Sequence, residues 1–210
     1  MSDINPRCLE FIGSKVQELI QNGVSVHLTK GNCVNDKYSG NFHADSKTIR
    51  VAMGNGDHSV YTFLHEYAHY VQFRDKRELW DKLHEGGTVK YSDWLYRSKN
   101  LTKEEIEQAF RNIVALEHDA ETMAISMIST HNLPLAIAQL SRTASCNLIY
   151  YAYTRIHRSW GKGHFSVCDA EVERQLPDVI QPLDFYTDMK NAKSIFKKSG
   201  IKIGKHTRYY

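Results

Sequence analysis

The stretch HSVYTFLHEYAHYVQF, residues 58–73, decides the fold that we expect for this chain. Its apolar side chains recur every three or four residues, which is the spacing of an α-helix. Gly54 to Asp57 break the preceding segment, and Asp57 is placed to cap the helix. At about 100° per residue, one side of this helix is apolar and is expected to face the core. The other side carries His65, His69, Tyr61 and Gln72 and is expected to point elsewhere.

The motif HEYAH, residues 65–69, lies inside this helix. Histidines four residues apart stand one turn apart on one helical face, so both imidazoles can reach a single cation. Zinc accepts neutral imidazole nitrogen, and a catalytic zinc site keeps one position for water. We therefore predict His65 and His69 as zinc ligands and Glu66 as the general base. The alternative is a chance match in a chain with 11 histidines.

A third ligand is expected from a second helix, which opens at Thr102 with a capping box to Glu105 and continues to about residue 128. Glu117 and Glu121 interrupt its apolar stripe. A buried carboxylate without a partner is costly, so both are expected to be paired or metal-bound. We predict Glu117 as the ligand and Glu121 as a partner of a ligand histidine. A salt bridge with a buried Arg is the alternative for Glu121. The neighbouring His118 and Asp119 are expected to be solvated.

These residues resemble a known group of metallopeptidases. H-E-x-x-H followed 48 residues later by E-x-x-x-E is similar to the gluzincin arrangement. The stretch LEHDAETMAISMI, residues 116–128, resembles the pattern of ImmA/IrrE-like metallopeptidases of phages and mobile elements. In that pattern the first Glu, here Glu117, is the zinc ligand. The resemblance implies a zincin-like fold and peptidase activity.

The remaining segments complete an α+β, zincin-like fold. Residues 7–21 predict a helix, and residues 135–157 predict a long, central one. Three short alternating segments at 24–29, 37–43 and 47–53 predict a small antiparallel sheet packed on the HEYAH helix. We expect one metallopeptidase domain over 1–185, with an insertion at 74–100 and a basic tail at 186–210.

A peptidase also requires a donor for the oxyanion of its tetrahedral intermediate. Tyr151 and His164 are the leading candidates downstream of the motif, although tyrosines on a helix more often serve in packing. A peptide substrate could add as a strand along an exposed sheet edge, in either 37–43 or 47–53.

Composition restricts the other function classes. The formal net charge is only +3, but residues 186–210 hold seven Lys or Arg and one acid, a local balance of +6. This tail is expected to be solvated, or to make a weak contact with nucleic acid or an acidic surface. Four cysteines without a C-x-x-C pair argue against a zinc ribbon. No apolar run of membrane-spanning length occurs, so we expect no membrane partner and a cytoplasmic protein, in the host cytoplasm if it is phage-encoded.

The function expected from these patterns is that of a zinc endopeptidase, which hydrolyses a peptide bond in a protein substrate with metal-activated water. The alternative is a catalytically silent protein of the same fold that binds a host, regulatory or nucleic-acid partner.

Overall fold

Helices dominate the computed structural model, which describes residues 4–35, 38–160, 170–201 and 203. A small sheet accompanies them, so the chain belongs to the α+β class. It divides into two units, Met1–Arg77 with Ala120–Leu140, and Glu78–Asp119 with Ser141–Tyr210. Each unit is described by itself below. Among the described residues, no helix combines the length and the apolar composition that crossing a membrane requires.

The first unit begins with helix α1, Pro6–Gln21. Its start follows from local chemistry, because the side chain of Asn5 accepts a hydrogen bond from the amide of Arg7 and Pro6 stands in the first turn. It ends at Asn22, and Gly23 adopts a φ of 75°, a left-handed conformation that favours glycine. The predicted helix at 7–21 is confirmed.

The sheet of this unit has three strands in the order β1-β3-β2. They are β1 Ser25–Thr29, β2 Gly40–His43 and β3 Thr48–Ala52. β2 pairs with β3 in antiparallel fashion, but β1 pairs with β3 in parallel. The predicted antiparallel sheet is therefore wrong for one of its two pairings, and the sheet is mixed. Alternation of side chains locates a strand without fixing the direction of its neighbour. β3 is central, so of the two predicted edge segments only 37–43 supplies an edge strand.

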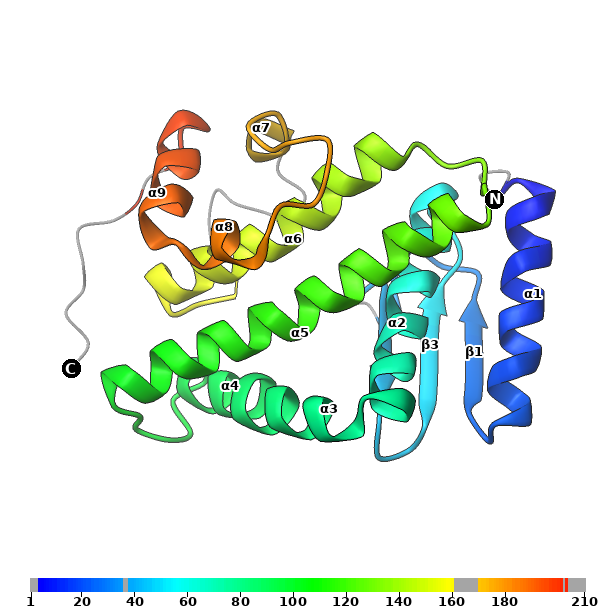
Figure 1. The fold of residues 1–210 in the computed structure, drawn as a ribbon, viewed down its shortest axis with the longest axis horizontal. Helices are drawn as coiled ribbons and strands as arrows, with labels where there is room; N and C mark the ends of the chain where they lie inside the picture. Colours follow the sequence, from blue (N-terminus) through cyan, green and yellow to red (C-terminus); the bar gives the residue numbers. More distant parts are fainter. Residues whose placement is uncertain (1–3, 36–37, 161–169, 202, 204–210) are drawn as a thin grey trace. The chain divides into compact units, whose positions relative to one another are not determined.

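Helix α2, Asp57–Asp75, carries the HEYAH motif. Its N-cap is Gly56, with a φ of 58°, and Asp57 is the first helical residue instead of the predicted cap. α1 lies alongside β1, and α2 packs on β2 and β3 (Figure 1). The histidine side was expected to point elsewhere than the core, but Tyr61, His69 and Gln72 are as buried as the residues of the apolar side.

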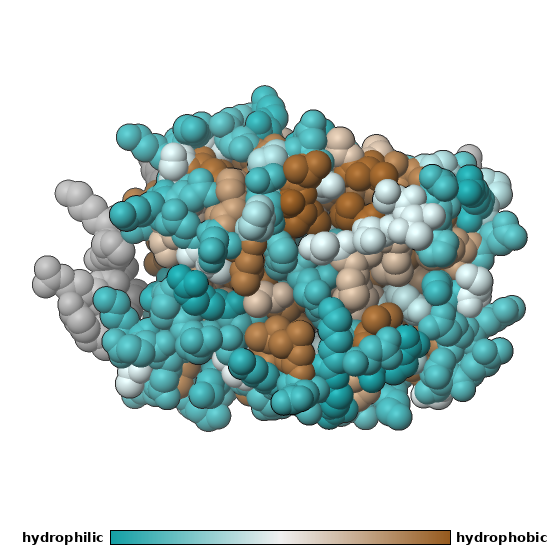
Figure 2. All heavy atoms as spheres, in the orientation of Figure 1, coloured by the Kyte–Doolittle hydropathy of each residue, from teal (hydrophilic) through white to brown (hydrophobic). Residues whose placement is uncertain are grey.

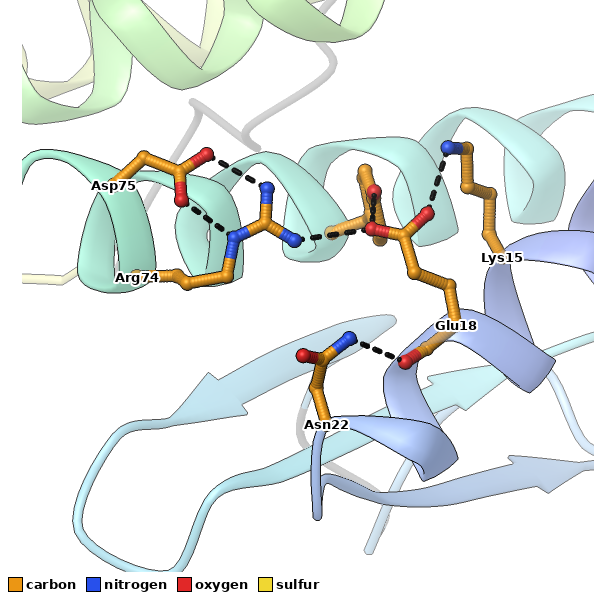
Figure 3. Close-up of polar contacts among 6 residues, drawn as sticks. Lys15, Glu18, Asn22, Arg74 and Asp75 are labelled. Atoms are coloured by element: carbon orange, nitrogen blue, oxygen red, sulfur yellow. Dashed lines mark hydrogen bonds and ion pairs between the residues drawn. The ribbon is translucent and has the colours of Figure 1, made fainter.

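A polar cluster joins α1 to α2 (Figure 3). Glu18 of α1 accepts hydrogen bonds from Lys15 at 2.9 Å and from Arg74 of α2 at 3.0 Å. The hydroxyl of Tyr67 donates to the same carboxylate at 2.6 Å. Tyr67 is the middle residue of HEYAH, so this cluster fixes the side of the motif that faces away from the histidines.

The second unit holds the larger apolar core. Residues 74–100, predicted as an insertion, are helical over most of their length. They form the end of α2, then α3 Arg77–Leu83, the π-helix η1 His84–Val89 and α4 Lys90–Leu95. Tyr91 and Trp94 belong to the core. α6, Ile137–His157, packs in the same core and confirms the predicted helix at 135–157.

Helix α5, Lys103–Thr130, is continuous and supplies residues to both units. Its predicted capping box is confirmed. The amide of Thr102 donates to Oε2 of Glu105 at 2.8 Å, and the amide of Glu105 donates to Oγ1 of Thr102 at 3.2 Å.

Three short helices end the second unit. They are α7 Ala170–Glu173, α8 Leu183–Thr187 and α9 Met189–Lys198. Part of the segment predicted as a basic tail is therefore helical, and Phe196 of α9 is fully buried.

Candidate metal centre

The two histidines of the motif meet on α2. His65 and His69 are four residues apart, so their side chains lie one turn apart on the same face. Their Nε2 atoms are 3.1 Å apart. His69 is only 9% exposed and the side chain of His65 is 16% exposed. The two side chains are thus largely shielded from solvent, so little water would compete with them for a bound ion.

Gln72 determines which nitrogen of His69 carries the proton. Nδ1 of His69 lies 2.8 Å from Oε1 of Gln72, and Gln72 is 2% exposed. An amide oxygen only accepts hydrogen bonds, so His69 donates from Nδ1. Its other nitrogen, Nε2, is the one that faces Nε2 of His65.

A buried carboxylate also lies at ion-pair distance from His65. Oε2 of Glu121 on α5 lies 3.2 Å from Nδ1 of His65, and Glu121 is 1% exposed. The hydroxyl of Tyr61 also donates a hydrogen bond to Oε2 of Glu121. The negative charge of this carboxylate can balance that of a cation bound by His65.

The two Nε2 atoms lie within hydrogen-bond distance of one another, so a proton can join the two rings. The same two atoms are the ones through which a shared metal ion would be bound. Nitrogens bound to zinc at 2.0 to 2.1 Å in a tetrahedron lie about 3.3 Å apart. The observed 3.1 Å is close to that separation.

Glu117 lies one helical turn before Glu121 on α5 and is half-buried. One ligand atom from each of His65, His69 and Glu117 can be chosen so that all three lie within 4.8 Å of one another. Two imidazoles and one carboxylate are the donor set of a catalytic zinc site with an open fourth position. The residues therefore fit zinc.

Glu66 lies between the histidines in sequence and points to the edge strand. It is 7% exposed. A Cβ atom added to Gly40 of β2 would lie 2.6 Å from Cγ2 of Thr62 and 3.2 Å from Oε1 of Glu66. Only glycine fits there without a shift of the neighbours, so the backbone of β2 closes one side of the space that the Glu66 carboxylate occupies.

The remaining predicted site residues lie elsewhere or are outside the description. Tyr151 belongs to α6 in the second unit, where its ring packs against Tyr91 and Trp160 with centroids 6.5 and 5.8 Å away. His164 lies outside the described residues. The roles of both remain predictions. His118 is not solvated as expected, because its Nε2 lies 2.8 Å from the carbonyl oxygen of Gln181. Asp119 is half-buried, contrary to the same expectation.

Sequence reasoning assigned no role to Gln72, Tyr61 or Gly40. Gln72 and Tyr61 had a signal in the sequence, since both fall on the histidine side of the helix. Gly40 had none, because its closeness to Glu66 depends on how a strand packs on a helix 17 residues later in the chain.

Comparison of the chain with protein-family models, with curated proteins and with solved structures gave no match. The resemblance to ImmA/IrrE-like metallopeptidases therefore rests on the motif residues alone.

Proposed function

We propose that this protein is a zinc-dependent endopeptidase that hydrolyses a peptide bond in a protein or peptide substrate. The observation that carries the proposal is the pair of Nε2 atoms 3.1 Å apart, each on a ring whose Nδ1 faces an acceptor. A chance H-E-x-x-H sequence would place two histidines on one face. It would not also place a buried Gln oxygen beside one Nδ1 atom and a buried carboxylate beside the other.

His65, His69 and Glu117 would hold the zinc ion, and Glu121 and Gln72 would orient the two imidazoles. Zinc, when bound, supplies a Lewis acid that lowers the pKa of water to about 7 and polarises a carbonyl. Glu66 is the residue that takes the proton from the attacking water and delivers it to the leaving amine. Its burial beside Gly40 keeps the carboxylate in one place and limits competing water.

The edge strand β2 supports a peptide as substrate. Among the described strands, β2 pairs only with β3, so its other edge can accept an extended chain. Gly40 of this strand lies beside the general base. A peptide added along β2 would therefore lie near Glu66, the proposed general base.

The first test measures the metal. Purified protein should bind one zinc ion per chain by elemental analysis, and His65→Ala and His69→Ala should each lose it. His27→Ala is the matched control, because His27 is exposed on β1 and should leave zinc binding unchanged. Equal zinc content in all four proteins would overturn the proposed site.

The second test measures catalysis without a known substrate. Proteins from cells that express the wild type or Glu66→Gln are compared by enrichment of new N-termini. Glu66→Gln should retain zinc and lose the new N-termini, with a rate loss of about 10² to 10⁴ on any substrate so identified. New N-termini that appear equally with both proteins, or with neither, would reject the peptidase.

A further inference from the structure

Helix α9 presents a basic face that the proposed peptidase does not use. The helix reads MKNAKSIFKK and contains no acidic residue. Ala192, Ile195 and Phe196 are buried in the core of the second unit. At 100° per residue its lysines gather on the opposite side of the helix. They are Lys190, Lys193, Lys197 and Lys198.

The position of α9 is fixed by packing and by polar contacts. Phe196 meets Tyr153 edge-on, with ring centroids 5.9 Å apart. The side chain of Asp188 accepts a hydrogen bond from the amide of Lys190 at 2.8 Å and so caps the helix. The side chain of Asn191 donates to the carbonyl oxygen of Phe185 at 2.8 Å. Packing and hydrogen bonds therefore hold in place the helix that carries the lysines.

Within the described part of the chain, the lysines of α9 are not paired with acidic side chains. Among residues that the structure describes, no acidic side chain lies within ion-pair distance of any of the four lysines. Lys197 and Lys198 at the helix C-terminus are favoured by the helix dipole, but Lys190 in the first turn is opposed by it. Helix stability alone thus does not account for the placement of the four lysines. Figure 1 places α9 at the upper left, and hydrophilic residues predominate in that part of the surface in Figure 2.

We propose that the lysine face of α9 binds the phosphate backbone of a double-stranded nucleic acid, without base specificity. From Lys190 to Lys198 the helix advances about 12 Å. A duplex presents one negative charge per about 1.7 Å of its axis, so several phosphates lie within reach of this face. Lysine suits this task, because it acts as a point charge on phosphate.

Two other partners fit the face less well. Insertion into a membrane surface requires a free apolar face, and that of α9 is already covered by the core. A protein interface is typically centred on aromatic or apolar side chains and is depleted in lysine. The exposed positions of α9 hold Lys190, Ser194, Lys197 and Lys198.

The test uses the full chain and labelled 20-base-pair DNA and RNA duplexes of mixed sequence, titrated by fluorescence anisotropy between 50 and 200 mM salt. In the cluster variant, all four α9 lysines are replaced by Gln. The control variant replaces Lys30, Lys82, Lys90 and Lys103, which are exposed on separate parts of the chain, so both variants lose the same net charge. Circular dichroism checks that each is folded.

The cluster variant should bind either duplex at least about tenfold more weakly than the control, and the slope of log affinity against log salt should fall by about 3.6, or 0.9 for each of four phosphate contacts. Equal weakening in both variants would overturn the proposal, because net charge alone would then explain binding. Absence of duplex binding by the wild type would overturn it too, as would lysine-dependent binding confined to polyglutamate or to vesicles of anionic lipid.

Discussion

Nδ1 of His69 lies 2.8 Å from Oε1 of Gln72, three residues later on the same helix. This one contact selects the tautomer of His69, because the amide oxygen can only accept. With Nδ1 occupied by Gln72, Nε2 is the nitrogen through which His69 would bind the proposed metal ion, and it lies 3.1 Å from Nε2 of His65. A buried glutamine therefore orients one of the two histidines of the proposed metal site.

Replacing Gln72 with Leu should weaken zinc binding by about 10 to 100-fold, since the ring of His69 then loses the acceptor that orients it. Gln72→Glu keeps an acceptor at this position and should restore most of the affinity. Isothermal titration with zinc measures both. Gln17→Leu, on an exposed position of α1, serves as the control. A folded Gln72→Leu protein that binds zinc as tightly as the wild type would show that Gln72 only fills space.

Gly40→Ala should destabilise the protein by about 1 to 3 kcal/mol, because the new Cβ would press on Thr62 and on the Glu66 side chain. Gly13→Ala is the matched control. Gly13 lies inside α1 with nothing within 4 Å of an added Cβ, so the same substitution should stabilise by about 0.5 to 1 kcal/mol. Urea denaturation measures both. Equal effects of the two substitutions would contradict the close approach of β2 to Glu66.

Glu18 should make stability depend on pH in the acidic range. Burial raises its pKa, but hydrogen bonds from Tyr67, Lys15 and Arg74 outweigh that effect, and the net pKa lies below the ordinary value of 4.5. A lowered folded pKa stabilises above the unfolded value and loses that contribution as the pH falls through the folded value.

Glu18→Gln should therefore lower the free energy of unfolding at pH 7 and reduce its loss between about pH 5 and 3. The measurement is urea denaturation across that range. Glu10→Gln, an exposed substitution on the same helix, is the comparison. If Glu18→Gln and the wild type showed the same dependence of stability on pH, the polar cluster of α1 and α2 would not be the cause of that dependence.

Local patterns made much of this protein predictable. Helix geometry alone brings His65 and His69 to one face, since the angle between them depends only on four residues of backbone. The capping box of Thr102 and Glu105 is equally local, because its two hydrogen bonds close within one turn. The apolar stripe of α5 also marked Glu121 as a carboxylate that must find a partner.

Contacts between distant segments were not predictable in the same way. Alternating side chains located three strands, yet the parallel pairing of β1 with β3 depends on the path of the chain between them. Likewise, the periodicity of α2 suggested a histidine side that points away from the core, but Glu121 in the C-terminal part of α5 packs against it.

By itself, the sequence determined which side chains can share a helical face and where helices begin, because those relations follow from a few residues of regular backbone. Only the tertiary structure decided that Glu121 and Tyr61 meet beside His65 and that Gly40 meets Glu66. These contacts join residues 26 to 60 positions apart in the sequence, and their geometry depends on the packing of whole elements, which no local period encodes.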